Sequence, residues 1–412
     1  MNNVYTGIEL GTNSVKVVVV LKQNGSYHVL ASVNSKADGI RNGQIQDIKM
    51  AVSSVRRAMK QINDMLGFKV VKVIAAIPPS NCMMDIVVGS CDVIDYDCIS
   101  GEDVRAVLKD ALTGHIDEEY EVITASPISF KVDDQENIKD PKGMAGKVIE
   151  AKVVVSTLAK EPLYRILEVL KLSGLETVDI AYSSTGDYFS IRNDKYDSEV
   201  GAIINIGELA TNVSVFNRGI QIKNSLLPIG SFNVDKDLSY VFGISLDESR
   251  KVKESFAVAT AGYADANDVM SLNISDGSSK ELSQVEVSKV VQARVEEILK
   301  LAKNEINTLT KREIRYIIVT GGLSELAGFQ YEVENVLGLK AKVCNIPIMG
   351  VRHNKYSSAL GVVKYFDDKL ALRGKNLSMI SDTDWNSLIT ANKKIATNNN
   401  IINKVFGHFF DN

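Results

Sequence analysis

The sequence predicts an α/β protein with two related lobes, because one order of strands and turns occurs in each half of the chain. Apolar runs bounded by turn residues predict three short strands per half, and a polar turn beginning with glycine separates the first two strands. The expected strands lie at 4–10, 15–21 and 27–33 in the first half and at 200–206, 213–216 and 220–227 in the second. Helical periodicity follows each set, at 48–66 and at 246–259.

Composition narrows the class of protein. The 412 residues are 45% hydrophobic and 24% charged, which is typical of a folded protein with more than one core. The formal net charge of −4 leaves no positive excess to cover a phosphate backbone, so nucleic acid is not an expected partner. The four cysteines form no CxxC pair, and the four histidines lack metal-binding spacing. Cysteines this sparse fit a cytosolic protein best, and the longest apolar run near the start, 17–21, is far shorter than a signal sequence or a membrane span.

The turn between the first two strands carries groups that suit an anion. Gly11, Thr12, Asn13 and Ser14, followed by Lys16, offer backbone N–H groups, two hydroxyls and an amine. An ordinary polar hairpin turn contains the same kinds of residue, so this turn alone does not establish a phosphate site.

A third motif lies far downstream, where the apolar strand 316–319 runs into Thr320, Gly321, Gly322, Leu323 and Ser324. Paired glycines let a ligand ring approach the backbone closely. The alternative is a plain turn from strand to helix, with Ser324 as the residue that caps the helix.

In this order, the two hairpin turns and the Gly-Gly turn resemble the phosphate-one, phosphate-two and adenosine motifs of the actin, Hsp70 and sugar-kinase superfold. The resemblance narrows to the FtsA family of bacterial cell-division proteins at residues 39–47, 138–146, 349–352 and 356–359, which are similar to segments of that family. It implies an actin-like fold of duplicated ribonuclease-H-like lobes, an inserted small α+β subdomain and a C-terminal amphipathic helix. The inserted subdomain would replace actin's usual one and contact the next protomer of a filament.

The resemblance also implies domain boundaries. These are subdomain 1A at 1–82 and 161–196, subdomain 1C at 83–160, subdomain 2A at 197–229 and 308–374, subdomain 2B at 230–307, a flexible linker at 375–398 and a membrane-targeting helix at 399–412. The strand pattern at 148–158 and the amphipathic helix expected at 102–112 agree with a small α+β module for subdomain 1C.

Carried over residue by residue, the resemblance implies a site for ATP and Mg²⁺. The nucleotide-binding residues would be Gly11, Thr12, Asn13, Ser14, Lys16, Asn205, Gly207, Glu208, Lys253, Glu254, Gly321, Gly322, Leu323 and Ser324. Within this set, Lys253 and Glu254 would flank the base and ribose. Glu9 and Asn205 would hold the magnesium ion through water.

The chain departs from an actin-type ATPase at the ends of its repeated strands. Such an enzyme places two aspartates around the magnesium-bound triphosphate, whereas this chain has Glu9 and Asn205. An amide cannot act as a base, and Glu208 would repel a triphosphate unless it points at magnesium or away. The stretch 179–192, where actins keep a water-orienting glutamine, contains none. We therefore expect ATP binding with slow hydrolysis at most, and no catalytic residue is assigned.

The last residues form a separate apolar pattern after a polar stretch, 375–400, that ends in three asparagines. Six large apolar residues would share one side of a helix, and they are Ile401, Ile402, Val405, Phe406, Phe409 and Phe410. At ~1.5 Å per residue this helix would be about 15 Å long, too short to span a bilayer but suited to lying in its interface. The alternative is that the stripe docks on the protein's own core or in a partner groove.

The resemblance implies mainly a structural adaptor, and at most a slow ATPase. It would polymerise, tether the tubulin-like FtsZ ring to the cytoplasmic face of the cell membrane at the division septum, and recruit later division proteins. The FtsZ C-terminal peptide would bind subdomain 2B, where a helix at 282–309 exposes Lys289, Arg294, Lys300 and Lys303. Two alternatives remain, a PilM-like actin homologue of pilus assembly and a sugar or acyl kinase, which would need a carboxylate base in the first lobe.

Overall fold

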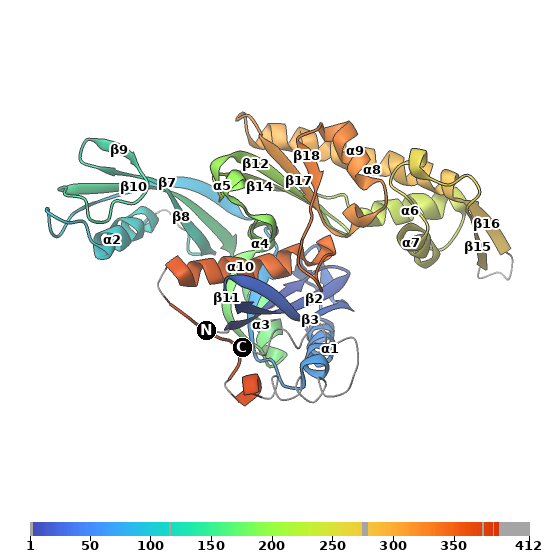
Figure 1. Cartoon of the computed structure of the whole chain (residues 1–412), viewed down its shortest axis with the longest axis horizontal. Coiled ribbons are helices and arrows are strands. Elements are labelled where there is room, and N and C mark those ends of the chain that lie inside the picture. Colours follow the sequence, from blue (N-terminus) through green and yellow to red (C-terminus); the bar gives the residue numbers. More distant parts are fainter. Residues whose placement is uncertain (1–2, 115–116, 274–278, 373–374, 382, 387–412) are drawn as a thin grey trace. The chain divides into compact units, whose positions relative to one another are not determined.

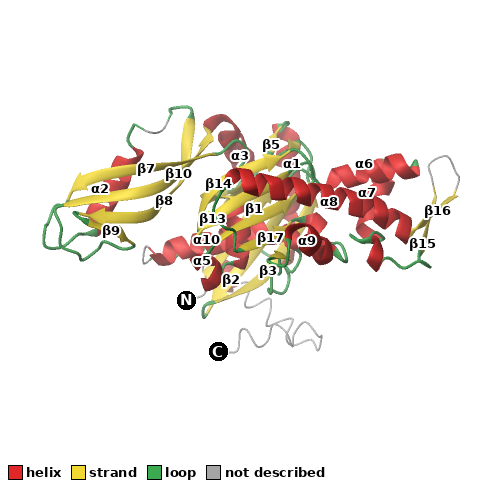
Figure 2. Ribbon diagram, turned by 90° about the horizontal axis from the view of Figure 1, so that it is seen from above, coloured by secondary structure: helices red, strands yellow, loops and turns green. Residues whose placement is uncertain are grey.

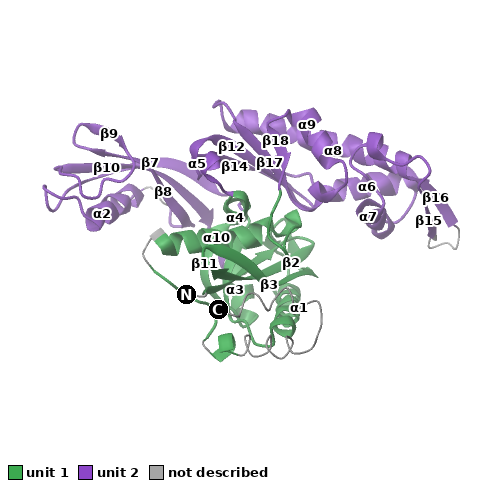
Figure 3. Cartoon of the chain, viewed as in Figure 1, with its two compact units in different colours: residues 1–78, 165–191, 345–412 green, residues 79–164, 192–344 purple. Residues whose placement is uncertain are grey.

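The computed structural model describes residues 3–114, 117–273, 279–372, 375–381 and 383–386 (Figure 1). The chain divides into two compact units (Figure 3). Unit 1 contains Met1–Pro78, Arg165–Ile191 and Asn345–Asn412, and unit 2 contains Pro79–Tyr164 and Arg192–Cys344. Among the described residues, no helix is both long and apolar enough to cross a membrane.

Unit 1 is built on a five-stranded sheet with the strand order β11-β6-β1-β2-β3. Its strands are β1 (Asn3–Leu10), β2 (Ser14–Gln23), β3 (Ser26–Lys36), β6 (Lys72–Ile77) and β11 (Glu176–Tyr182), and a two-residue pair, β4 (Ile40–Arg41) and β5 (Gln44–Ile45), follows β3. The first three strands form an antiparallel meander, whereas β6 is parallel to both β1 and β11. The valines at 17–20 in β2 are fully buried, because helices cover the sheet and both faces of the strand are apolar.

The helices of unit 1 are α1 (Ile48–Leu66), α3 (Lys160–Leu172), which begins in unit 2, α4 (Ser183–Ile191) and α10 (Ser357–Leu372). Asp47 caps α1 by accepting a hydrogen bond from the Met50 N–H at 2.9 Å. Helix α10 packs on β1, β2 and β6 and crosses α4 at very short range. A Cβ atom on Gly361 would lie only 1.6 Å from the Gly186 carbonyl oxygen, so this crossing requires glycine.

Unit 2 repeats the same sheet, with the order β14-β13-β12-β17-β18. Its strands are β12 (Val200–Ile206), β13 (Thr211–Asn217), β14 (Ile220–Leu227), β17 (Tyr316–Thr320) and β18 (Ala341–Val343). The first three are again an antiparallel meander, and β17 is again parallel to its two neighbours. Figure 2 shows β13, β14 and β17 among the strands in yellow. This identity of order and direction confirms the duplicated lobes predicted from the sequence.

The other elements of unit 2 pack around this sheet. They are α5 (Asp194–Ser198), α6 (Ser231–Phe242), α7 (Leu246–Ser255), the hairpin of β15 (Val269–Asn273) and β16 (Ser279–Ser283), α8 (Gln284–Leu309) and α9 (Phe329–Leu337). One apolar cluster joins α6, α7, α8 and α9 to the sheet. Helix α7 ends at Ser255, four residues before the end expected at 259, and the Ala259 N–H bonds the Ala327 carbonyl instead of continuing the helix.

The inserted module is a four-stranded antiparallel sheet in the order β7-β10-β8-β9, packed against one helix. Its elements are β7 (Met83–Asp92), α2 (Gly101–Leu112), β8 (Tyr120–Val132), β9 (Gln135–Ile138) and β10 (Val148–Ala159). Ser100 and Asp103 form a capping box at the start of α2. The small α+β insert predicted from the sequence is therefore confirmed, while the exact subdomain boundaries stay a prediction.

The stretch predicted as a flexible linker, 375–398, begins with residues that are packed in place. The Met379 N–H donates to the Val4 carbonyl at 2.9 Å, and Ser378 Oγ accepts from the Val4 N–H at 3.3 Å. Since β6 pairs with β1 only at residues 7–9, the start of β1 keeps free backbone groups for this contact. The linker prediction is wrong for this part. The rest of the stretch from residue 387, and the predicted helix at 399–412, lie outside the described residues.

Candidate functional site

The first predicted phosphate turn joins β1 and β2 in unit 1. The Gly11 N–H donates to the Ser14 carbonyl at 3.0 Å, and a Cβ atom on Gly11 would lie 2.9 Å from that oxygen. Thr12 Oγ1 accepts a hydrogen bond from the Asn42 N–H at 3.0 Å. A hydroxyl that accepts through its oxygen still has its own hydrogen to donate. The turn thus presents a Thr12 hydroxyl that can donate to an anion.

A charged pair lies beside this turn. Glu9 and Lys16 are directly opposite in the β1–β2 register, and Lys16 Nζ is 3.3 Å from Glu9 Oε2. The Lys16 ammonium also lies over the turn, since it is 3.1 Å from the position of a Cβ on Gly11. The structure therefore brings together the predicted phosphate-binding amine and the predicted magnesium-binding carboxylate, both only about 16–17% exposed.

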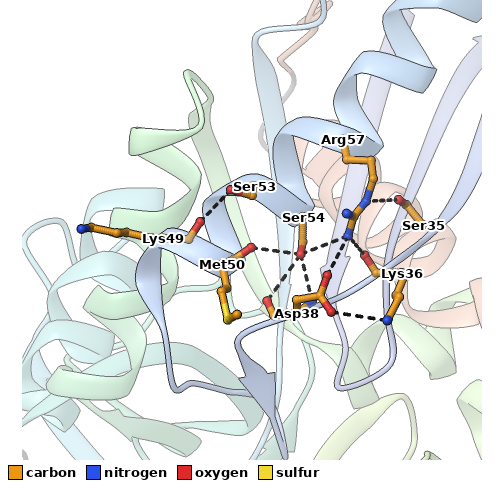
Figure 4. Close-up of polar contacts among 8 residues, drawn as sticks. All are labelled: Ser35, Lys36, Asp38, Lys49, Met50, Ser53, Ser54 and Arg57. Carbon is orange, nitrogen blue, oxygen red and sulfur yellow. Dashed lines mark hydrogen bonds and ion pairs between the residues drawn. The ribbon is translucent and has the colours of Figure 1, made fainter.

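The loop after β3 is hydrogen-bonded to the first turn. The Ala37 N–H donates to the Asn13 carbonyl at 2.9 Å. Next to it, the Asp38 N–H donates to Ser54 Oγ on α1 at 2.9 Å, and Arg57 of α1 donates to the Asp38 carboxylate at 3.1 Å (Figure 4). Helix α1 thereby holds Asp38, the residue before the segment 39–47, whose Asn42 N–H bonds Thr12.

The second predicted turn, between β12 and β13 in unit 2, repeats the geometry of the first. The Gly207 N–H donates to the Ala210 carbonyl at 3.0 Å, and a Cβ on Gly207 would lie 2.9 Å from that oxygen. By strand register, Asn205 and Asn212 occupy the places that Glu9 and Lys16 hold in unit 1. Each lobe therefore has a hairpin of the same geometry, with a charged pair of residues in unit 1 and a pair of amide residues in unit 2.

Asn212 is a further candidate residue of the second turn that the sequence reasoning missed. It is 9% exposed, its Nδ2 donates to Ser214 Oγ at 2.8 Å, and its Oδ1 accepts no hydrogen bond from any described residue. Counting seven positions on from Asn205, as from Glu9 to Lys16, would have found it.

Glu208 does not present an uncompensated charge in the second turn. Its carboxylate contacts the guanidinium of Arg250 on α7. The repulsion expected for Glu208 is therefore offset by a cation that the sequence reasoning left unassigned.

Lys253, expected beside the base and ribose, is 6% exposed, and its ammonium lies 2.7 Å from the Asp235 carboxylate of α6. Its charge is already balanced inside unit 2. Glu254, the next residue of α7, is exposed.

The third predicted motif follows β17. Gly321 has φ +99, and a Cβ there would lie 2.8 Å from Asn205 Oδ1, so the Gly321 backbone and the Asn205 side chain meet where β12 and β17 end. Ser324 is not a helix cap, since its hydroxyl donates back to the Gly321 carbonyl at 2.7 Å within the short 3-10 turn Gly322–Glu325. Gly321, Leu323 and Ser324 are all buried, which leaves Gly322 as the exposed residue of this motif whose backbone a ligand can approach.

Comparisons with known proteins agree with this architecture. The family model described as cell division protein FtsA matches residues 202–361, and the model described as the SHS2 domain inserted in FtsA matches residues 86–157. The FtsA protein of Bacillus subtilis (strain 168) is 26% identical over 380 residues, which cover 91% of this chain and 86% of that protein. The FtsA protein of Enterococcus hirae is 27% identical over 368 residues, covering 88% and 82%.

Two solved structures share the fold at low identity. The type IV pilus PilM–PilN complex matches with a TM-score of 0.59 and 14% identity, covering 90% of this chain and 99% of that one. MreB5 of Spiroplasma citri bound to ADP matches with a TM-score of 0.54 and 12% identity, covering 91% and 99%. These matches confirm the predicted actin-like fold.

Proposed function

Because the chain belongs to the FtsA family of cell-division proteins, we propose that it is an ATP-binding adaptor that forms filaments and tethers the FtsZ ring to the membrane. The observation that carries this proposal is the match to two models specific to that family, one over residues 202–361 and one over residues 86–157 of the insert. In this role the protein would act on the cytoplasmic face of the membrane at the division septum and recruit later division proteins.

ATP binding is supported by the repeated turns. Thr12, Lys16 and the N–H groups of residues 12–14 would hold phosphates from unit 1, and the turn at Gly207 would do so from unit 2. Gly321 and Gly322 would border the adenosine. The bound ADP of MreB5 from Spiroplasma citri, a protein of the same fold, adds support.

The residues present fit a magnesium ion held through water. The Glu9 carboxylate, whose Oε2 lies 3.3 Å from Lys16 Nζ, and the Asn205 amide each offer a hard oxygen from their own unit. Carboxylate and amide oxygens that contact metal-bound water are the donors magnesium favours in proteins. The ion would balance the charge of the triphosphate there, while Lys16 balances Glu9.

Hydrolysis should be slow. Asn205 cannot act as a base. The carboxylate of Asp187, in the stretch 179–192, accepts hydrogen bonds from the Ser357 and Ser358 hydroxyls at 2.6 and 2.7 Å, and the residue is only 2% exposed. The Asp187 carboxylate therefore joins α4 to α10. The same argument weakens the kinase alternative, which needs a carboxylate base in this lobe.

Membrane binding and polymerisation would reinforce each other. One short amphipathic helix binds lipid weakly, but a filament presents many copies on one surface and raises the effective concentration of each next helix. We therefore expect filaments on vesicles of phosphatidylethanolamine and phosphatidylglycerol when ATP is present, and few with either component missing. Electron microscopy would show them, and phosphate release in the same sample should stay far below that of muscle-type actin. Soluble monomers under all conditions would contradict the proposal.

The FtsZ tail would bind unit 2 on α8, although most of the cations expected there already have partners. Arg294 is held by Asp237 at 2.6 and 2.8 Å, Lys300 lies 2.7 Å from Glu296, and Lys303 donates to the Val336 carbonyl. Lys300 and Lys303 line a surface hollow of about 460 Å³. An acidic peptide would compete with these contacts and bind weakly.

The FtsZ tail peptide should accordingly bind at low salt and dissociate as salt rises. Fluorescence anisotropy with a labelled peptide measures this, and Lys300→Glu should weaken binding several-fold, whereas Lys311→Glu near the end of α8 should not. No binding at low salt would count against the FtsZ partner. The pilus-assembly alternative shares the fold seen in the PilM–PilN complex, but both family models favour division.

A further inference from the structure

Four side chains of alternating charge run from the second turn into the helices of unit 2. Glu208 in the turn contacts Arg250 of α7, whose Nε lies 3.6 Å from Asp235 Oδ2 of α6. Asp235 Oδ1 in turn lies 2.7 Å from Lys253 Nζ, also of α7. This charged chain of Glu208, Arg250, Asp235 and Lys253 links residues up to 45 positions apart in the sequence.

The charged chain is more buried than ordinary surface pairs. The side chain of Asp235 is 1% exposed and that of Lys253 is 8% exposed, whereas Glu208 and Arg250 are at 16% and 31%. Removing one member of such a set leaves its partner's charge uncompensated, which costs far more than losing an exposed pair. Burial favours a lower pKa for Arg250, but the charges of Glu208 and Asp235 outweigh it and raise the pKa, so the guanidinium stays ionised.

The backbone keeps Glu208 at the turn. The Ser231 N–H donates to the Gly207 carbonyl at 2.9 Å, and the Phe232 N–H donates to the Glu208 carbonyl at 2.8 Å. A Cβ on Gly230 would lie 2.5 Å from the Glu208 carbonyl oxygen, so the start of α6 is pressed directly against the turn. These contacts prevent the Glu208 backbone from moving away from the turn. The charge of its carboxylate must therefore be compensated at the turn itself.

We propose that Arg250 is the positioning residue that makes the second turn compatible with a nucleotide phosphate, because it neutralises Glu208 and ties that carboxylate to Asp235. This inference rests on the proposed function, in which the turn at Gly207 receives phosphate. Without Arg250, Glu208 is an unpaired anion next to the phosphate chain. ATP, which carries one more phosphate than ADP, is repelled more strongly.

Nucleotide binding by the full chain tests this assignment. Dissociation constants for ATP and ADP would be measured for the wild type, Arg250→Gln, Glu208→Gln, the double variant and Arg250→Lys. We expect Arg250→Gln to weaken ATP binding by about tenfold or more and ADP binding less, with a smaller loss at high salt. Glu208→Gln in the same chain should restore ATP affinity to within about threefold of the wild type, and Arg250→Lys should retain most of it.

Arg192→Gln is the matched control. Arg192 has a comparable paired carboxylate, Asp197, and a side chain 34% exposed, but it lies outside the charged chain. Its loss should lower the melting temperature about as much as Arg250→Gln and leave ATP affinity unchanged.

The outcomes distinguish a failure of the proposed function from a failure of the role given to Arg250. A wild type that binds neither nucleotide overturns the proposed function and this assignment with it. A wild type that binds ATP, together with an Arg250→Gln variant that keeps its affinity or is not rescued by Glu208→Gln, overturns the role of Arg250 alone.

Discussion

A chain that ends at Asn400 is expected to lose vesicle binding by at least about a hundredfold. The removed residues carry six large apolar side chains on one predicted helical face, and burying each is worth ~1.5–3 kcal/mol. Even half of that burial exceeds the ~2.7 kcal/mol that a hundredfold change in affinity requires, after allowance for ordering the helix. Flotation of the intact and shortened chains with phosphatidylethanolamine and phosphatidylglycerol vesicles measures the difference.

Two point variants of the intact chain sharpen this experiment. Phe406→Ser interrupts the apolar face and should weaken flotation, whereas Lys404→Ser, on the polar side or its edge, should change it little. Equal flotation of the intact and shortened chains would show that the apolar stripe serves a protein surface and not lipid.

Gly361→Ala is expected to destabilise unit 1 by at least about 3 kcal/mol. The added methyl group would overlap the Gly186 carbonyl, which is backbone of α4 and cannot rotate away. A Cβ on Gly186 would meet the Ser358 carbonyl at 2.5 Å, so the two helices have no free side on which to separate locally. Overpacking of a core usually costs 1–3 kcal/mol, and a clash with fixed backbone belongs at or above the top of that range.

Urea denaturation followed by fluorescence measures this loss, since the chain's single tryptophan, Trp385, lies in unit 1. Ala371→Val adds methyl groups to the same helix at an exposed position and should shift stability by no more than about 0.5 kcal/mol. An unchanged midpoint for Gly361→Ala would mean that α4 and α10 do not cross at this distance in solution.

Several elements could be predicted because their signals are local. A buried strand, a turn beginning with glycine and a second strand occupy about twenty consecutive residues, and strand alternation sets which side chains share a face. The pairing of Glu9 with Lys16 across one hairpin follows from that pattern. The same counting leads to Asn212 in the second hairpin, and it was missed only because an asparagine in a strand carries no chemical signal by itself.

The sequence by itself determined the duplicated α/β lobes, the two hairpin turns that begin with glycine and the apolar stripe of the last residues, because each depends on the order of neighbouring residues. Only the tertiary structure decided which charges are already neutralised. Arg250 is 42 residues from Glu208, and Lys253 is 18 residues from Asp235, so neither pair exists until α6 and α7 pack beside the second turn. Met379 joins β1 for a similar reason, since β6 leaves the first residues of that strand unpaired.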